Sequence, residues 1–413
     1  MTAATATRTA VSAAQNRVRC PLSRSVIARP TELRCVRVRP AGSARAYKRP
    51  APRTGRRHVP SDGEQGLSGF TEIPEISATS WRQHNADAAA HDLVSVCHHV
   101  GFFTLVDHGI DESFLEAYFA GLRAFFALPR STKEQIAKHR SPHFRGWEDI
   151  GSELTDNKVD YREQLDVSTE NPAYPEGAEP AFLRIDGPNQ WLAESTLPGF
   201  RPLVLEFFRV MGQLADELMS VLARGLELPI PTFADRFGEH PYSLVKLISY
   251  PQTPAGQAGV NGHHDAGFLT LLLQHGVAGL QAQNPNGDWI DIPPRDGAIV
   301  VNLGEMLQSM TGNYLVATTH RVVASEPRYS SAYFHGPDLR ASLHPLDLHP
   351  RFARAVAASP RHRDAGFMAR REDLLNGSSG TTARPAGLFG EQLWNYYRRS
   401  YPELVARHHP DVA

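Results

Sequence analysis

The sequence predicts a mainly β fold of the α+β class, in which helices flank a strand-rich core. Between Leu244 and Tyr333, short apolar runs alternate with turn-forming segments, whereas longer segments earlier in the chain carry apolar residues at helical spacing. The length of 413 residues permits a large buried core. The contents of 41% hydrophobic and 21% charged residues are typical of a globular protein. Many short strands at this spacing are typical of a β-sandwich or a double-sheet jelly roll.

The first 68 residues are predicted to be a disordered, basic extension. They are rich in Arg, Ala, Ser and Pro, contain few large apolar residues and show no sustained periodicity. Residues 1–61 contain 14 Arg or Lys and one acid, Glu32, which leaves a charge of −14 for the rest of a chain whose net charge is −1. An acidic body argues against nucleic acid as the main partner.

Two interpretations of this extension stay open. An acid-poor start that is rich in Arg and Ser matches an organelle transit peptide, but a start codon placed too far upstream gives the same composition. We favour the second and expect a cytoplasmic protein. No apolar run approaches the roughly 18 to 20 residues that cross a bilayer, so we expect no membrane partner. The cysteines Cys20, Cys35 and Cys97 lack CxxC spacing, which argues against a disulfide scaffold or a cysteine zinc site.

Residues 69–240 are predicted to form a mixed α/β region with a helical flank. The folded chain is expected to begin near Ile73. The expected elements are a helix at Asp87–His98, a strand at Gly101–Val106, and helices at Glu112–Ala127 and Phe200–Leu226.

Residues 241–341 are predicted to form the β core, and residues 342–413 a helical C-terminal segment. Turn-forming stretches such as Asn284–Asp288 separate the strands. The expected strands are Leu244–Tyr250, Phe268–Leu273, Gly279–Gln283, Trp289–Ile292, Ala298–Leu303, Thr319–Val323 and Ser330–Phe334. In the C-terminal segment we expect a flexible patch at Asn376–Gly380 and a helix at Glu391–His408.

Two histidines and an aspartate have the pattern of a metal site. His263 and Asp265 stand two apart at the expected start of a strand, so extended backbone would point both side chains to one face. His320 lies 55 residues beyond Asp265, on a short strand that can pair back. Two imidazoles and one carboxylate suit Fe(II) and leave positions open for substrate and dioxygen. An HxD pair alone is weak evidence in a chain with 19 histidines.

These residues and several ordered motifs resemble the isopenicillin N synthase-like family of Fe(II)- and 2-oxoglutarate-dependent dioxygenases. The resemblance runs from Ile73 to Pro337 and includes Arg328-Tyr329-Ser330, which matches the family's RxS element. The supporting motifs are Gly101-Phe102-Phe103, His108-Gly109-Ile110, Gly187–Trp191, Gly279-Leu280-Gln281 and Gly297–Gly304. The resemblance implies a double-stranded β-helix, or jelly-roll, core.

The resemblance also implies the roles of the site residues. Fe(II) would be held by His263, Asp265 and His320. The distal carboxylate of 2-oxoglutarate would be held by Arg328, whose planar fork suits a carboxylate, and by Ser330. Tyr250 would contact the co-substrate or the substrate carboxylate. The implied activity is oxidation of a small metabolite by O2, as hydroxylation, desaturation or ring formation, with release of succinate and CO2.

Other activities remain open at this point. An oxidase of the same fold would use iron and O2 without 2-oxoglutarate, and Arg328 would then hold the substrate's own carboxylate. Loose matches near Ser331–Pro337 resemble ethylene-forming enzymes, and a metal-free binding module is the third alternative. Where many plant members have Asn, this chain has Ile248, so one polar contact to the co-substrate is expected to be absent. We expect a monomer and assign no catalytic residue beyond the metal ligands.

Neighbouring polar and aromatic residues have ordinary interpretations. His264 is expected to be a surface histidine or one that supports the site without binding the metal, and His108 a structural histidine in a turn. Asn302 and Glu305 are expected to fix a turn. Phe144, Trp147 and Trp191 are expected in the core by default, with the substrate mouth as the alternative. The sequence does not decide whether Asp160–Glu163 is a solvated face or the rim of a pocket.

Overall fold

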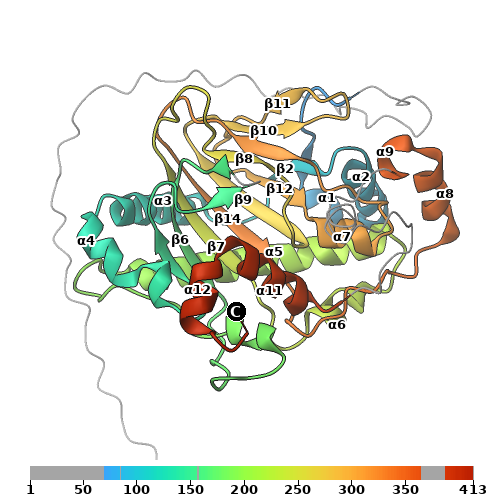
Figure 1. Cartoon of the computed structure of the whole chain (residues 1–413). Coiled ribbons are helices and arrows are strands. Elements are labelled where there is room, and N and C mark those ends of the chain that lie inside the picture. The colour runs from blue at the N-terminus through green and yellow to red at the C-terminus, as the bar shows by residue number, and fades with distance from the viewer. Residues whose placement is uncertain (1–68, 84, 156–157, 364–386, 413) are drawn as a thin grey trace, which may run out of the picture. The chain divides into compact units, whose positions relative to one another are not determined.

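A computed structural model describes residues 69–83, 85–155, 158–363 and 387–412 (Figure 1). The disorder predicted for residues 1–68 and the flexible patch predicted at Asn376–Gly380 lie outside the described residues. In this part of the chain, no helix combines the length and the apolar character that a membrane crossing requires.

An eight-stranded sheet forms the larger layer of the core. Its strand order is β1-β2-β12-β9-β14-β7-β6-β3, and all neighbours are antiparallel except the parallel pair β1 and β2. The bounds are β1 Glu75–Ser77, β2 Phe102–Val106, β3 Gly146–Glu148, β6 Glu163–Ser168, β7 Leu244–Tyr250, β9 Leu269–His275, β12 Ile299–Leu303 and β14 Arg328–His335. Strands from residues 69–240 therefore extend the sheet that the β core begins.

A four-stranded antiparallel sheet forms the second layer, with the order β11-β10-β13-β8. The bounds are β8 Val260–His263, β10 Leu280–Gln283, β11 Trp289–Asp291 and β13 His320–Val322, and a separate hairpin is formed by β4 Leu154–Thr155 and β5 Lys158–Val159. Buried side chains from both sheets, such as Ile248 and Tyr250 from β7 and Val260 from β8, pack in one cluster between them. This is the predicted jelly-roll arrangement of two facing sheets.

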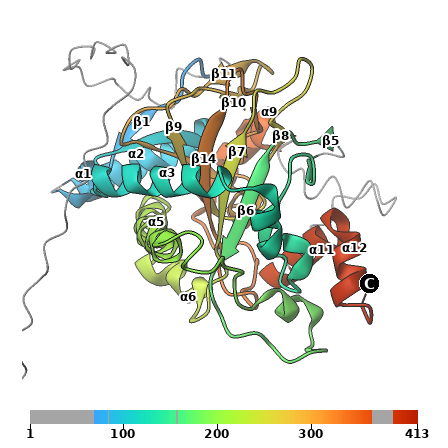
Figure 2. The ribbon, with the colours of Figure 1, turned by 90° about the vertical axis from the view of Figure 1, so that its left-hand side faces the viewer.

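Three helices cover the outer face of the large sheet (Figure 2). They are α2 Ala86–His99, α3 Glu112–Phe126 and α5 Phe200–Gly225. Because side chains alternate along a strand, Val245 and Leu247 pack in the helix-side core, whereas Lys246 and Ile248 face the small sheet. The charged side chain of Lys246 consequently lies in the space between the sheets.

Shorter helices complete the described chain. They are α1 Thr79–Arg82, α4 Arg130–Lys133, α6 Ala234–Phe237, α7 Glu305–Met310, α8 Pro350–Ala358, α9 Pro360–Arg363, α11 Phe389–Ser400 and α12 Pro402–His408. The prediction of a single helix at Glu391–His408 is wrong. Helix α11 ends at Ser400 and α12 begins at Pro402, because a proline has no N–H with which to continue the helical hydrogen bonds. Strands β1 and β3 to β6 and helices α1, α4 and α6 to α9 were not predicted. Of these, β1, β3, β4 and β5 are only two or three residues long, which is too short for a periodic pattern.

Gly101, between α2 and β2, provides a test of this packing. It adopts φ +73°, and an added Cβ would lie 2.1 Å from the carbonyl oxygen of Val316. We expect Gly101→Ala to lower the free energy of unfolding by about 2 kcal/mol or more, because it adds a backbone clash to the cost of a positive φ. Urea unfolding followed by circular dichroism measures the loss.

Gly177→Ala is the matched control for that measurement. Gly177 has nearly the same φ, +74°, but its added Cβ would meet no atom of the described residues within 4 Å. It should therefore show only the cost of the backbone conformation, roughly 1 kcal/mol. Equal losses in the two variants would show that the contact between Gly101 and Val316 is not tight.

Candidate functional site

The three residues of the predicted metal site meet between the two sheets. His263 ends β8, His320 begins β13, and the two face each other as register partners. Oδ1 of Asp265 lies 3.6 Å from Nε2 of His263 and 3.7 Å from Nε2 of His320. One nitrogen or oxygen atom from each side chain lies within 4.8 Å of the others. This spacing lets a single cation contact all three.

A β-bulge in β8 turns His263 toward the site. His320 pairs with His263 and Val322 pairs with Val260, so three steps along β8 match two along β13. In a regular strand Val260 and His263 would face opposite sides, whereas the extra residue lets both face the space between the sheets. The expectation that His263 and Asp265 share the start of one strand is wrong. Asp265 lies beyond β8, where its carbonyl oxygen accepts a hydrogen bond from the backbone N–H of Glu305 (2.8 Å).

Hydrogen bonds leave one atom of each side chain available for a metal. Oδ2 of Asp265 accepts from Oγ1 of Thr270 (2.5 Å) and from Nδ2 of Asn302 (2.7 Å), which orients Oδ1 toward the histidines. Nδ1 of His263 donates to the carbonyl of Asn261 (2.8 Å), and Nδ1 of His320 donates to that of Thr318 (3.1 Å). With the proton on Nδ1, the lone pair of each Nε2 faces Asp265.

Asn302 corrects one prediction. It was expected to fix a turn, but it lies inside β12, directly opposite Thr270 on β9, and holds the aspartate. A polar residue within the apolar run Ile299–Leu303 was the available signal in the sequence.

Burial and neighbouring charges set the protonation of the three side chains. Burial alone would raise the pKa of Asp265, but the two histidines and Asn302 hold it well below its usual range, so the carboxylate is ionised. Burial lowers the pKa of His320 to about 4. Burial also opposes charge on His263, yet the adjacent Asp265 carboxylate raises the pKa of His263 above its ordinary value.

A buried arginine lines the same space on the large sheet. Arg328 is 1% exposed, and its Nη2 donates to Oε1 of Gln274 (3.0 Å) while its guanidinium stacks 4.9 Å from the ring centre of Tyr250. Nε and Nη1 of Arg328, and Oγ of the buried Ser330, have no hydrogen-bond partner among the described residues. A buried cation with free donors is costly unless an anion meets it. These donors are therefore suited to a carboxylate, and we call the group formed by Tyr250, Gln274, Arg328 and Ser330 the Arg328 pocket.

Strand register places this pocket beside the metal ligands. Arg328 is the partner of Tyr250, and Ser330 lies between Ile248 on β7 and Gln274 on β9. Thr270, which holds Asp265, faces the same side of β9 as Gln274. Ile248 offers only apolar surface opposite Ser330.

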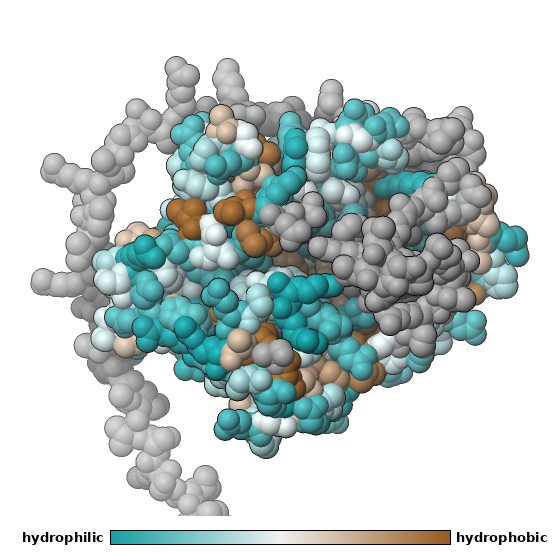
Figure 3. Space-filling view, in the orientation of Figure 1, coloured by the Kyte–Doolittle hydropathy of each residue, from teal (hydrophilic) through white to brown (hydrophobic). Residues whose placement is uncertain are grey.

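An apolar rim lies near His263. Ile150, Leu154 and Val159 are 42%, 52% and 53% exposed, and they form part of a hydrophobic patch around the β4–β5 hairpin (Figure 3). A cavity of about 520 Å³ separates this hairpin from Gly256–Ala258 and reaches Asn261, two residues before His263. Such a volume is typical of sites for small molecules.

The ordinary interpretations of the other residues mostly agree with their positions. His264 is part of no ligand set in the described chain, and its Nε2 lies 2.9 Å from Oγ1 of Thr319. His108 bridges a turn through contacts with Gly297 and Ile110. Phe144 is 1% exposed and stacks on Tyr397, so it belongs to the core.

One group of functional candidates was missed. Asp160 and Arg162, which the sequence left undecided, belong to a buried network of charged side chains with Glu153, Asp166 and Lys246. Charged residues within the apolar strands β6 and β7 were the available signal.

Comparisons with known proteins agree with this geometry. Residues 73–194 match the family described as "non-haem dioxygenase in morphine synthesis N-terminal", and residues 241–337 match the 2OG-Fe(II) oxygenase superfamily. The chain is 34% identical over 290 residues to the 2-oxoglutarate-dependent dioxygenase frbJ of Dothideomycetidae sp., covering 68% of this chain and 78% of that protein. It is 30% identical over 373 residues to a 2-oxoglutarate-dependent dioxygenase of Gibberella zeae, covering 84% and 93%.

The fold also matches solved structures. The crystal structure of full-length Neurospora crassa T7H in complex with alpha-KG has a TM-score of 0.58 and 26% sequence identity, and the match covers 67% of this chain and 88% of that one. T7H has also been crystallised with alpha-KG and thymine, with a TM-score of 0.58 and 27% identity over the same shares of both chains.

Proposed function

Because the chain belongs to the 2-oxoglutarate- and Fe(II)-dependent oxygenase superfamily, we propose that His263, Asp265 and His320 hold its iron and that Arg328 and Ser330 hold 2-oxoglutarate. The enzyme oxidises a small molecule, with O2 as oxidant and 2-oxoglutarate as co-substrate. The observation that carries the co-substrate assignment is the set of free donors on Arg328 and Ser330, which face the same space as the three metal ligands.

The residues fit both groups. Two neutral imidazole nitrogens and one carboxylate oxygen, each left available by its hydrogen bonds, form the ligand set of non-haem Fe(II) oxygenases. Bound iron supplies the oxidation chemistry. The protein holds the far carboxylate of 2-oxoglutarate through the Arg328 fork, orients the ligands through Thr270 and Asn302, and limits water by burying the site between two sheets.

The organic substrate is proposed to be a small metabolite. The cavity of about 520 Å³ beside Asn261 is large enough for a small metabolite. T7H, a structural relative, has been crystallised with a small molecule of this kind, thymine. The apolar rim at Ile150 and Val159 would cover such a molecule.

Succinate release tests the proposed function. The purified chain, supplied with Fe(II), ascorbate, 2-oxoglutarate and air, should convert 2-oxoglutarate to succinate, and a panel of metabolites should be screened for compounds that raise the rate. A chelator should abolish release and added Fe(II) should restore it. Glutarate, which has both carboxylates but no keto group, should bind without being consumed. Substrate oxidation without succinate would replace the proposal with an oxidase that does not use the oxo acid.

Iron affinity is expected to fall as the pH drops through the pKa of His263. A proton competes with the metal for Nε2, and because the pKa of His263 is raised, this competition begins at a higher pH than for an ordinary histidine. His320, with a pKa of about 4, stays neutral to more acidic pH. Anaerobic Fe(II) titrations of the metal-free protein between about pH 8 and about pH 5.5 measure the effect. A constant affinity across that range would contradict it.

A further inference from the structure

Seven charged side chains form a cluster at one end of the space between the sheets, of which five are buried and two, Glu148 and Arg162, are partly buried. The charged cluster consists of Lys138, Glu148, Glu153, Asp160, Arg162, Asp166 and Lys246. Lys246 alternates with Ile248 and Tyr250 on the inner face of β7, and Asp166 on β6 is its register partner. The cluster therefore shares the inner sheet face with the Arg328 pocket.

Ion pairs connect the members of the cluster. Nζ of Lys246 lies 3.0 Å from Glu153 and 3.4 Å from Asp166, and Nη2 of Arg162 lies 2.6 Å from Glu153 and 3.2 Å from Asp160. Nζ of Lys138 lies 2.8 Å from Asp166. Lys138 also contacts Glu148, a neighbour of Gln164 across β3 and β6.

The cluster reaches the metal ligands through a short chain of hydrogen bonds. Oδ1 of Asp160 accepts from the backbone N–H of Asn261 (3.1 Å) and from its Nδ2 (3.0 Å). The carbonyl of Asn261 in turn accepts from Nδ1 of His263 (2.8 Å). The Asp160 end of the cluster is thus linked through Asn261 to a metal ligand.

Charge in the cluster is not balanced. Four carboxylates, Glu148, Glu153, Asp160 and Asp166, face three cations, Lys138, Arg162 and Lys246, which leaves one negative charge in excess. An uncompensated buried charge is costly.

Two buried acceptors, one on Asp166 in the cluster and one on the nearby Gln164, also lack a hydrogen-bond partner among the described residues. Oδ1 of Asp166 (4% exposed) and Oε1 of the neighbouring Gln164 (1% exposed) accept no hydrogen bond within the described chain. The side chain of Gln164 is oriented by a hydrogen bond that its Nε2 donates to Glu148 (2.7 Å). Among the donors of the cluster, as far as the described residues show, only Nε of Arg162 is buried without a hydrogen-bond partner. Buried polar atoms are normally paired, so these positions call for a ligand with several N–H donors and at least one acceptor.

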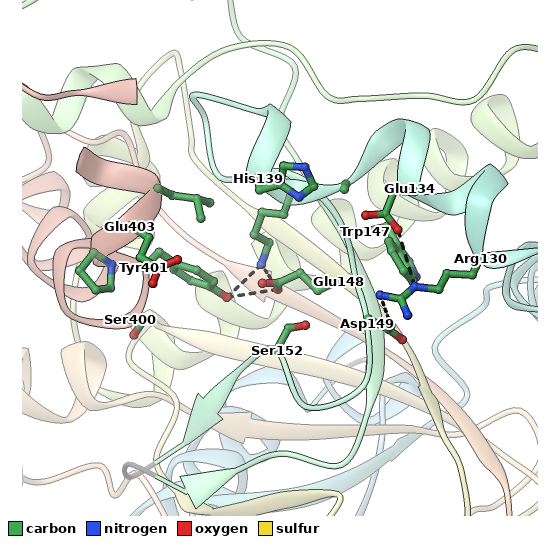
Figure 4. Close-up of a pocket in the computed structure, with 14 residues that line it drawn as sticks. Arg130, Glu134, His139, Trp147, Glu148, Asp149, Ser152, Ser400, Tyr401 and Glu403 are labelled. Atoms are coloured by element: carbon green, nitrogen blue, oxygen red, sulfur yellow. Dashed lines mark hydrogen bonds and ion pairs between the residues drawn. The ribbon is translucent and has the colours of Figure 1, made fainter. Parts of the chain in front are cut away.

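Space for a small molecule borders the cluster. Lys138, Glu148 and Tyr401 line a cavity of about 500 Å³ between β3 and α12, and Figure 4 shows Tyr401 and Glu148 meeting at its wall. This cavity is a different one from the cavity beside Asn261, and it borders the Lys138 and Glu148 end of the cluster. The C-terminal helices close over the cluster: the Tyr396 hydroxyl donates to Glu153 (3.0 Å) and the Tyr401 hydroxyl to Glu148 (3.3 Å).

We propose that the charged cluster binds the substrate through a basic nitrogen, an amine or a guanidine, with Asp166 and Gln164 as the accepting side chains. One positive charge neutralises the cluster, its N–H groups satisfy both free acceptors, and the rest of the molecule extends toward the iron. This inference rests on the proposed function and specifies the substrate class of the same site.

Binding of charge-matched probes tests the inference. Hexylamine, butylguanidine, 1-hexanol and hexanoate are titrated calorimetrically, under nitrogen, into protein loaded with Fe(II) and saturated with 2-oxoglutarate. The two cationic probes should bind at millimolar concentration, and at least roughly tenfold more tightly than 1-hexanol or hexanoate. Tighter binding of hexanoate, or no binding of either cationic probe, would overturn the assignment.

Variants locate the binding. Asp166→Asn keeps the side-chain shape and one acceptor but makes the cluster neutral. It should therefore lower the affinity for hexylamine by about tenfold or more. Gln164→Leu removes the other free acceptor without a change of charge and serves if Asp166→Asn does not fold. Glu163→Gln is the matched control, because Glu163 pairs with Lys133 and stands between Arg162 and Gln164 on the alternate face of β6. Unchanged amine binding in a folded Asp166→Asn or Gln164→Leu variant would refute the site.

The same samples separate this inference from the proposed function. Iron content and 2-oxoglutarate affinity should be equal in the wild type, Asp166→Asn and Glu163→Gln. If 2-oxoglutarate fails to bind the wild type, the proposed function is wrong. If 2-oxoglutarate binds but the cationic probes bind no more tightly than 1-hexanol and hexanoate, only the proposed substrate class is wrong.

Discussion

Asp265→Ala is expected to abolish tight Fe(II) binding and with it all oxidation. Asp265 supplies the only carboxylate of the ligand set, and its charge lies 3.6 and 3.7 Å from the two histidine nitrogens. Without it, two neutral imidazoles face the metal, and we expect affinity to fall by about a hundredfold or more. Metal analysis after gel filtration and succinate release measure the two losses. His263→Ala and His320→Ala should act in the same direction.

His264→Ala is the matched control for the ligand variants. His264 stands between two of the ligands in sequence but contacts Thr319, so its replacement should leave stoichiometric iron. Circular dichroism should show that the Asp265→Ala protein is folded, because the β scaffold forms the site without needing the metal. Full turnover with stoichiometric iron in Asp265→Ala would remove this residue from the ligand set.

Arg328→Leu is expected to lower the affinity for 2-oxoglutarate by at least about 30-fold. Truncating one partner of a buried carboxylate–guanidinium pair costs roughly 2 to 5 kcal/mol, and every 1.4 kcal/mol is about tenfold in affinity. Because the other end of 2-oxoglutarate would still be held by iron, the organic substrate should lose much less affinity. Arg328→Lys should rescue binding only in part, since an ammonium lacks the planar fork. Titrations under nitrogen with Fe(II) measure both affinities.

Arg321→Leu is a close control for Arg328→Leu. Like Arg328, Arg321 donates to a glutamine side chain, Gln281 (2.8 Å), and stacks on an aromatic ring, Trp289 (4.0 Å). It follows His320 directly on β13, so its side chain points to the opposite face of the strand, away from the site. Its loss should leave 2-oxoglutarate affinity unchanged. If Arg328→Leu leaves co-substrate binding intact while substrate binding is lost, Arg328 holds the substrate's carboxylate instead.

Much of the core could be predicted from local patterns. The strand expected at Leu244–Tyr250 has the observed bounds, and the strands expected near Ala298–Leu303 and Ser330–Phe334 differ by one or two residues at their ends. These strands are apolar and bounded by Pro, Gly or Asn, and both signals are local. The short strands β3, β4 and β5 carry too few residues for any period to be detected.

The sequence by itself determined which residues meet as candidate metal ligands and which strand carries the co-substrate pocket. These assignments depended on the ordered motif matches to a known family, because the HxD pair alone was weak evidence and His320 lies 55 residues beyond Asp265. Spacing alone placed only Arg328 and Ser330, which stand two apart on one strand, on a common face. Only the tertiary structure decided the bulge in β8, the bond from Asn302 to Asp265, and the charged cluster. Lys246, Asp166 and Glu153 come from segments far apart in the chain. Their contact depends on which strands pair and in what register, and a local pattern of apolar residues records only which face of its own strand is buried.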